Sequence, residues 1–414
     1  MKSRLGHAAL LAVCLSAASA PAEELRSSIA LAQAISLALQ HNTDMRASGQ
    51  DVASAHGALV QASALPNPGL SLSSVAATVS PLGAPVPGTV GVSWTVPIGG
   101  KRSAGIASAE AGLSAAKATN AAVRQQISLA VATGFVNVLL ARALLEFALQ
   151  DQANFRQSLD LNELRYKDGK IAFGDVLKLR IQALAEDDTV RQARQNLISA
   201  RADLLQLLGE GAVKPDYEVE GALEPAPQVA ETTPESLLAA ALARRPDYLA
   251  LADQTEAARH GLTQARRQPI PDLGVSVEYS HASGVPDTYD IGLSVSVPLF
   301  DRNTGNIEQA AAALEKARIA QEALRIQLRD AATKAVTEWR SSSEQLGAYR
   351  SGVESARESL EISRHAYELG QGSLLDFLSA QTSYRQVEGA YRSAQARTAL
   401  AAWTLRFVAG EEIK

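Results

Sequence analysis

The sequence has few of the residues that build catalytic and metal sites. It contains one cysteine, Cys14, two methionines and six histidines, the latter at positions 7, 41, 56, 260, 281 and 365. The histidine positions show no paired spacing typical of metal ligands, and no Ser/His/Asp or Cys/His signature of a nucleophile occurs. The chain is therefore predicted not to be an enzyme, and we expect it to hold no cofactor and no metal.

Aromatic residues are also few, and the chain has no excess of positive charge. Aromatics make up 5% of the chain, and 39 Lys and Arg residues are set against 44 Asp and Glu residues. A chain without a basic excess is not predicted to bind nucleic acid. The shortage of aromatics, together with many alanines, favours closely packed helices over a bulky globular core.

Long apolar runs are absent beyond the N-terminus. Residues 1–22 combine Lys2 and Arg4 with an apolar stretch and small residues, which predicts a secretory signal peptide. Cys14 follows Val13 within it, a poor match to a lipidation site, and without this segment the chain has no cysteine for disulfides. The later apolar segment 127–141 is short of the roughly 20 residues that a membrane-spanning helix needs. We expect an exported protein without a transmembrane helix.

What the sequence does contain is a repeat. Three pairs of segments match in order at offsets of 201 to 203 positions: 64–73 with 267–276, 90–100 with 291–301, and 165–177 with 366–378. The matches predict an internal tandem duplication, with repeats at 23–209 and 235–414 and a connector rich in proline and acidic residues at 210–234. Each repeat reads as a helix, a β-hairpin, a long helix, a turn and a helix.

The hairpins are predicted at 69–97 and 272–298. Apolar and small polar residues alternate without a break in 89–97, 272–280 and 289–297, and less regularly in 69–79. Prolines, which cannot continue a helix or a central strand, mark the joints between strands and helices. These joint residues are Pro68, Pro97, Pro271 and Pro298.

The flanking segments show helical rather than strand periodicity. Small and apolar residues recur at spacings of three and four, which is the pattern of a coiled coil, and no proline interrupts 99–165 or 304–367. At 1.5 Å per residue, a helix of about 65 residues spans on the order of 100 Å. We therefore expect an elongated, mainly α-helical molecule with a β part at the hairpins.

Four strands of roughly ten residues have the length of membrane β-strands. They cannot close a barrel alone, and open sheet edges are not tolerated in lipid, so two or more chains would have to combine. A soluble sheet with one hydrated face is the alternative. The sequence favours the membrane barrel, because each hairpin stands between long helices with no other β-structure to cover it.

The repeated unit resembles the outer-membrane efflux protein family, the TolC-like channel tunnels. The stretches PNPGLSL, PIGGKRSAGIASAE and PLFDRNTGNI are similar to the CzcC-like branch, which serves heavy-metal cation efflux. The resemblance implies a homotrimer whose strands form a 12-stranded barrel in the outer membrane of a Gram-negative cell, continued by a periplasmic α-barrel. It also implies a periplasmic adaptor protein and an inner-membrane RND pump as partners. Alternatives are multidrug efflux, type I protein secretion, or a periplasmic scaffold without a pore.

The turns 165–177 and 366–378 lie between paired helices. Their glycines and acidic residues fit helix C-caps and favourable charges at helix N-termini. By resemblance, they form the periplasmic tip, where the adaptor docks and the tunnel is gated, and Asp376 would line the constriction, with Ser379 where relatives can carry a second acid. The residues concerned are Tyr166, Gly169, Asp175, Tyr367, Gly370 and Asp376.

Three further features have two interpretations each. Trp94, Tyr279 and Tyr289 fit an aromatic girdle at the lipid interface, although aromatics are also common strand residues. The acidic run 186–188 is predicted to be a solvated helix face. The stretch from Gly99 to Ser103 looks like a phosphate-binding loop, but Thr95 occupies the place of its first glycine. We interpret it as a strand–helix joint.

Overall fold

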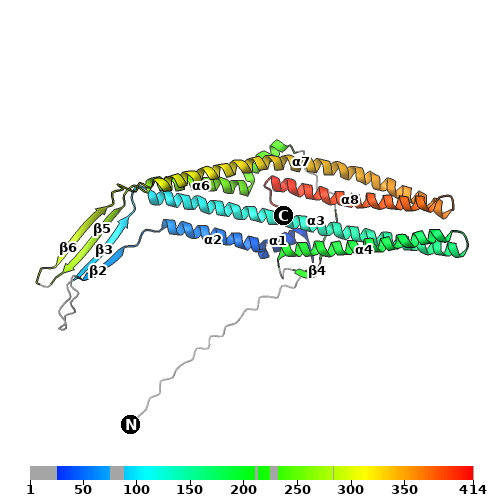
Figure 1. Ribbon diagram of the computed structural model, residues 1–414, viewed down its shortest axis with the longest axis horizontal. Coiled ribbons are helices and arrows are strands. Elements are labelled where there is room, and N and C mark those ends of the chain that lie inside the picture. The colour runs from blue at the N-terminus through cyan, green and yellow to red at the C-terminus, as the bar shows by residue number, and fades with distance from the viewer. Residues whose placement is uncertain (1–25, 75–87, 210–212, 224–231, 283, 414) are drawn as a thin grey trace, which may run out of the picture.

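The computed structural model describes residues 26–74, 88–209, 213–223, 232–282 and 284–413, so the predicted signal peptide lies outside the described residues. The molecule is elongated, with a sheet at one end and two helical turns at the other (Figure 1). The helices are α1 Leu31–His41, α2 Thr43–Ser63, α3 Lys101–Lys167, α4 Phe173–Leu208, α5 Pro234–Arg244, α6 Pro246–Arg267, α7 Thr304–Glu368 and α8 Leu374–Val408. The strands are β1 Arg26–Ile29, β2 Gly69–Ser74, β3 Gly88–Val96, β4 Val213–Val219, β5 Leu273–His281 and β6 Thr288–Val295.

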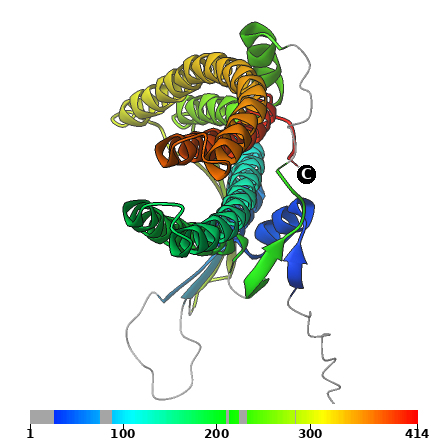
Figure 2. The same cartoon turned by 90° about the vertical axis from the view of Figure 1, so that its right-hand side faces the viewer.

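The two long helices are continuous, as their lack of internal proline predicts. α3 has 67 residues and α7 has 65, so each is about 100 Å long. α3 packs against α2, α4 and α6, and α7 packs against α6 and α8. Viewed along the long axis, the helices form a curved wall rather than a closed bundle (Figure 2).

The apolar middle of α3 differs from the sequence expectation. Within the described part of the chain, α3 is the single helix that could cross a membrane by length and composition. Half of its most apolar window is buried inside the molecule. Val131, Phe135 and Leu139 belong to a hydrophobic core that also contains residues of α1 and α4. The apolar run is therefore accounted for by packing between helices.

A small parallel sheet of β1 and β4 was not predicted from the sequence. β4 lies inside the segment interpreted as a connector, and it pairs with β1 near the middle of the molecule. Tyr217 of β4 is fully buried, and its hydroxyl donates to the Arg201 carbonyl at 2.9 Å. Arg142 of α3 donates to the Val219 carbonyl at 2.7 Å. The connector is thus fastened to α3 and α4.

The four-stranded sheet has the order β2-β3-β5-β6, and every neighbouring pair is antiparallel. The central pair, β3 and β5, joins the two halves of the chain. Strand bounds agree with the predictions within two residues for β3, β5 and β6. The first predicted strand, 69–79, is described as β2 only to Ser74, and its remainder lies outside the described residues.

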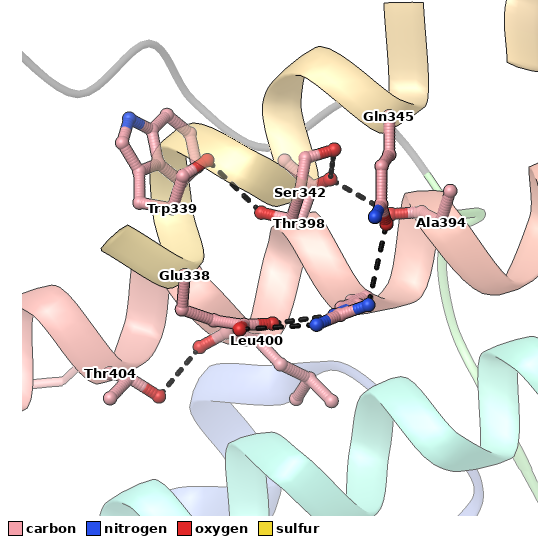
Figure 3. A network of polar contacts seen from close by, with 9 residues as sticks. Glu338, Trp339, Ser342, Gln345, Ala394, Thr398, Leu400 and Thr404 are labelled. Carbon is pink, nitrogen blue, oxygen red and sulfur yellow. Dashed lines mark hydrogen bonds and ion pairs between the residues drawn. The ribbon is translucent and has the colours of Figure 1, made fainter. Parts of the chain in front are cut away.

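A polar seam holds α8 against α7 (Figure 3). Arg397 binds the Glu338 carboxylate through two nitrogens, at 2.5 and 3.1 Å. The buried Thr398 hydroxyl donates to the Ser342 carbonyl at 3.1 Å. Ser342 is completely buried, and a small residue here allows the two helices to approach closely. Small residues along these helices therefore replace the bulky aromatics that the chain lacks.

Candidate functional site

One face of the four-stranded sheet is apolar and uncovered. Most large hydrophobic side chains there are exposed, from 38% for Trp94 to 79% for Ile291. They come from all four strands, and the register places them in rows such as Leu70, Val92, Val277 and Ile291. In water, such a continuous apolar patch is unfavourable, so this face requires an apolar environment.

The opposite face is made of small polar residues. Glycine, serine and threonine occupy nearly every position, for example Ser93, Ser276 and Gly292 in one row. Glu278 and Asp290 are the only charged residues on this face of the described sheet, and they are directly opposite each other in the register. The sheet therefore separates an apolar side from a hydrated and locally acidic side.

The three aromatic residues predicted at the membrane interface lie toward the two ends of the apolar face. Trp94 is near the helical end, and its indole Nε1 donates to the Pro66 carbonyl at 2.8 Å. Tyr279 and Tyr289 are paired across β5 and β6 near the connecting loop, with ring centroids 5.2 Å apart. Aromatics thus lie toward both ends of the apolar face, and the interfacial girdle stays a prediction.

The predicted strand–helix joints lie together at the helical end of the sheet. Pro68 directly precedes β2 and Pro97 directly follows β3, while Pro271 and Pro298 lie within three residues of β5 and β6. In the first joint Gly99 and Gly100 have φ of 74° and 73°, and Gly100 is the N-cap of α3. In the second, Asn303 caps α7 with φ of 59°. Asparagine tolerates this left-handed conformation better than most residues, so the N-caps of α3 and α7 share a backbone conformation.

Side chains from the second half brace the first joint. Lys101 is buried, and its ammonium group lies 2.8 Å from Asp272 Oδ1, which also accepts the Ile98 N–H at 3.3 Å. Arg267 donates to the Gly100 carbonyl at 2.9 Å. A joint is therefore the correct interpretation of this stretch, with the lysine used in an ion pair. Sequence reasoning missed Asp272, although its counterpart in the first repeat is Gly69, a difference that could have indicated it.

The two tip turns have the same backbone motif at the end of the molecule opposite the sheet (Figure 1). Gly169 and Gly370 have φ of 74° and 75°. In each turn, the glycine N–H donates to the carbonyl three residues earlier, at 2.9 or 3.1 Å, and the next N–H donates five residues back, at 2.8 Å. These paired bonds form a Schellman motif, which satisfies the last carbonyls of α3 and α7.

Both predicted acidic residues occupy the third position of the helix that follows the turn. In the second turn, the Asp376 N–H donates to Ser373 Oγ at 3.1 Å, and the Ser373 hydroxyl donates to Asp376 Oδ2 at 2.7 Å. In the first turn, Ala172 supplies no such cap, and Asp175 lies 3.2 Å from Lys178. The carboxylates thus stabilise helix N-termini.

The two tip tyrosines have different surroundings. Tyr367 is buried, its hydroxyl donates to Asn162 Oδ1 at 2.9 Å, and its ring stacks on Phe377 with centroids 5.8 Å apart. The Arg165 guanidinium lies 5.5 Å from the Tyr367 ring centre. Burial raises the pKa of Tyr367, so the hydroxyl remains a donor. Tyr166, by contrast, is 42% exposed.

The predicted solvated face at 186–188 is wrong for its first residue. Glu186 is 2% exposed, because Arg385 of α8 and Gln182 bind its carboxylate inside the helical wall. Asp188 is exposed, as expected. Helical periodicity explains the difference, since neighbouring residues point in directions about 100° apart. Glu186 faces the interior, whereas Asp187 is half-buried and accepts hydrogen bonds from Gln152 and Arg156 of α3. Among the residues that the structure describes, no group of three potential metal-ligating residues occurs.

Comparison with known proteins identifies the family. The family model for outer membrane efflux proteins matches residues 34–210 and 237–411. The chain belongs to the outer membrane efflux protein family. This membership confirms the predicted outer-membrane localisation with an extension into the periplasm, and the prediction that the protein is not an enzyme. It also argues against the alternative of a periplasmic scaffold without a pore.

Among curated relatives, the cobalt-zinc-cadmium resistance protein CzcC of Cupriavidus metallidurans is 28% identical over 387 residues, covering 92% of this chain and 90% of the relative. The outer membrane protein TolC of Escherichia coli is 27% identical, covering 63% of this chain and 56% of its own. The alkaline protease secretion protein AprF of Pseudomonas aeruginosa is 25% identical, covering 69% and 62%. The resemblance to the family and to CzcC is thus confirmed.

Solved structures confirm the fold. CusC aligns with a TM-score of 0.79 at 19% identity, over 92% of both chains. The outer membrane protein VceC of Vibrio cholerae aligns with a TM-score of 0.77 at 22% identity, over 93% of this chain and 97% of its own. The long helices and four-stranded sheet described above are therefore the fold of the family's channels.

Proposed function

We propose that the protein is the outer-membrane exit duct of a tripartite RND-type efflux system, and that it passively exports divalent heavy-metal cations. The proposed cargo is of the cobalt, zinc, cadmium, nickel or copper type. The observation that supports the proposal of a duct is the uncovered apolar face of the four-stranded sheet. The opposite face of the same sheet consists of small polar residues. A β-barrel wall in a membrane has this construction, with lipid on one side and water on the other.

The unpaired edges of the sheet support a homotrimer. β2 and β6 end the strand order, so each presents an edge without a partner in this chain. An open edge in lipid leaves N–H and C=O groups unsatisfied, and pairing β6 of one copy with β2 of the next removes the edge. Three copies then close a 12-stranded barrel, which is larger than the roughly eight strands that a closed barrel needs.

The tip is the proposed docking surface for the periplasmic adaptor and the pump, and the gate of the tunnel. Support comes from the position of the two turns at the far end from the sheet (Figure 1). By this proposal, Asp376 faces the pore in the trimer, where three carboxylates would attract cations. Its hydrogen bond with Ser373 fixes the carboxylate at the start of α8.

The two halves of the chain are proposed to derive from a tandem duplication. Both halves run through two helices, two strands of the larger sheet, a very long helix and a helix of about half that length. The family model also matches each half. The shared joint and tip geometries support the same origin.

The substrate class rests on similarity. CzcC, whose name refers to cobalt, zinc and cadmium resistance, aligns over most of both chains, which favours metal cations. The acidic pair Glu278 and Asp290 on the polar sheet face is compatible with a cation path. The similarity to AprF, named for alkaline protease secretion, favours protein secretion as the second candidate.

Deletion of the gene tests the substrate. Under the metal proposal, the deleted strain becomes sensitive to one or more of cobalt, zinc, cadmium, nickel and copper, and a plasmid copy restores growth. Unchanged metal tolerance together with new sensitivity to hydrophobic drugs would reject it in favour of multidrug efflux. Loss of a secreted protein from the medium, with metal tolerance intact, would support the second candidate.

A matched pair of substitutions tests the lipid-facing assignment. Ile291→Lys places a charge in the middle of the apolar face, at a cost of about 2–4 kcal/mol. Ser276→Lys places the same charge on the polar face one row away. We expect heat-modifiable trimers in outer-membrane fractions for Ser276→Lys and their loss for Ile291→Lys. Equal amounts of trimer for the two variants would contradict the assignment.

A further inference from the structure

A buried group of charges links the two halves of the chain inside the helical wall. Asp151 lies on α3, Glu186 on α4, and Arg385 and Gln381 on α8. Asp151, Glu186 and Gln381 are each at least 93% buried, and the Arg385 side chain is 19% exposed. The group is roughly 24 Å along α3 from the tip, which separates it from the proposed docking surface.

One arginine serves two carboxylates in this group. Arg385 donates to Glu186 Oε1, while its Nε lies 3.6 Å from Asp151 Oδ2. Asp151 Oδ1 accepts a long bond from Gln381 Nε2, at 3.5 Å, and the Asp151 carboxyl group also interacts with that of Glu186. Asp151 Oδ2 and Gln381 Oε1 are both buried without a hydrogen-bond partner. If Asp151 is ionised, its buried negative charge has too few hydrogen bonds and too little positive charge around it to offset the cost of burial. A protonated, neutral carboxyl group does not carry this cost.

Other charged groups nearby do not neutralise the second buried carboxylate. A cavity of about 410 Å³ adjoins Asp151 between α3, α7 and α8. The Arg392 side chain points to Glu388 on its own helix, at 2.8 Å, and Arg357 is paired with Tyr384. On the α4 side, Asp188 lies at the surface and is paired with Arg191. The titratable and charged groups around Asp151 are Glu186 and Asp188 on α4, Arg357, Glu361 and Arg364 on α7, and Tyr384, Arg385, Glu388 and Arg392 on α8.

We propose that Asp151 is protonated when α8 is seated on α3 and α4, and that loss of this proton loosens α8. In the protonated state, the pair carries one negative charge, which Arg385 neutralises. In the deprotonated state, two buried carboxylates face one guanidinium, and the excess charge is relieved when α8 moves and water enters. This protonation-dependent contact of α8 lies in the helical wall. It therefore goes beyond the proposed export function and does not depend on the exported substrate.

The proposed titration of Asp151 falls in the mildly acidic range. Burial and the Glu186 carboxylate raise the pKa of Asp151 to about 6, against the opposing effect of Arg385. A raised carboxyl pKa means that the seated state binds more protons than the open state. The stabilisation is therefore complete below the ordinary pKa of about 3.8 and is lost as pH rises through about 6. The predicted direction is a tighter wall in acid and a looser wall at neutral pH.

Hydrogen exchange on the purified full chain tests the proposal. After correction for the intrinsic exchange rate, opening of the α8 segment around residues 381–388 should increase up to about a hundredfold between pH 4 and pH 7. Asp151→Asn removes the titrating group at nearly constant shape, so the segment should stay protected at pH 7 and lose its pH dependence. Asp203→Asn, at an exposed carboxylate of α4 about 25 Å along the helix from Glu186, is the matched control and should behave as wild type.

Two more variants test the proposal independently if Asp151→Asn does not fold. Glu186→Gln removes the negative neighbour and should move the midpoint to lower pH, while Arg385→Gln removes the cation and should move it to higher pH. A purely structural role would change the level of protection in these variants and leave the midpoint in place. The proposal is overturned if wild-type opening does not change between pH 4 and pH 7, or if Asp151→Asn keeps the wild-type profile.

Discussion

The first and second tip turns have the same backbone and different side-chain environments. Gly169 and Gly370 have nearly equal φ, and both turns close with the same two hydrogen bonds. Yet Tyr367 is buried against residues of α3 and α8, whereas its repeat counterpart Tyr166 is exposed. The backbone motif reverses the helix in both places, but only the tyrosine of the second turn is buried against the other half of the chain.

The difference shows that repeated residues need not have repeated roles. Phe155, Leu179, Tyr367, Leu374 and Phe377 form one small hydrophobic core, to which the first half contributes α3 and α4 and the second contributes α7 and α8. The second turn therefore positions the two helix pairs relative to each other. The first turn leaves its aromatic surface accessible in this chain.

Substitution of the two tyrosines should give the largest difference in stability between the two turns. Tyr367→Ala removes a buried ring, a stack and a hydrogen bond, and should lower the free energy of local opening at the tip by about 3–4 kcal/mol. Tyr166→Ala should cost less than about 1 kcal/mol, because its ring is exposed. Hydrogen exchange of the turn peptides in detergent measures both. Tyr367→Phe, which loses only the bond to Asn162, should fall between them, and similar losses for the two alanine variants would contradict the asymmetry.

Substitution of the glycines should have equal effects on the two turns. Gly169→Ala and Gly370→Ala each force a left-handed conformation on alanine, at about 1–2 kcal/mol. No atom lies within 4 Å of a Cβ added at either position, so the cost comes from the backbone alone. The same exchange measurement applies, with Gly174→Ala, at a helical position that is also open, as the control. A difference of more than about 1 kcal/mol between the two turns would mean that they do not share one motif.

Exchange of the caps should give the smallest effect, with opposite signs in the two turns. Ser373→Ala removes the side-chain cap of α8 and should destabilise its first turn by about 1 kcal/mol. Ala172→Ser introduces the same cap at α4 and should stabilise it by about 0.5–1 kcal/mol. Exchange rates of the first amides of each helix measure the change. Destabilisation by Ala172→Ser would show that the first turn cannot accommodate the serine geometry.

Much of the fold could be predicted from local pattern. The lengths of α3 and α7 follow from the absence of proline, and β3, β5 and β6 follow from strict alternation. The joint from Gly99 to Ser103 could be separated from a phosphate loop because Thr95 lacks the required conformational freedom of glycine. These features depend on neighbours in the sequence, which is the information that periodicity and motif spacing contain.

The features that could not be predicted depend on contacts between residues far apart in the sequence. β1 has four residues, too few for periodicity, and its partner β4 lies beyond α1, α2, β2, β3, α3 and α4. The burial of Tyr367 depends on Asn162, and that of Glu186 depends on Arg385. No local signal distinguishes Glu186 from Asp188, since only the arrival of α8 decides which carboxylate is buried.

The pairing of β3 with β5 has a consequence for the order of folding. All of α3, α4, α5 and α6 lies between these strands, so the centre of the sheet cannot form until both halves of the chain have been exported. Helices and hairpins form from nearby residues and are fast, whereas strands distant in sequence pair late. The helical wall therefore serves as the scaffold that brings the two hairpins together. We therefore expect the continuous apolar sheet face to be completed only after the helical wall has assembled.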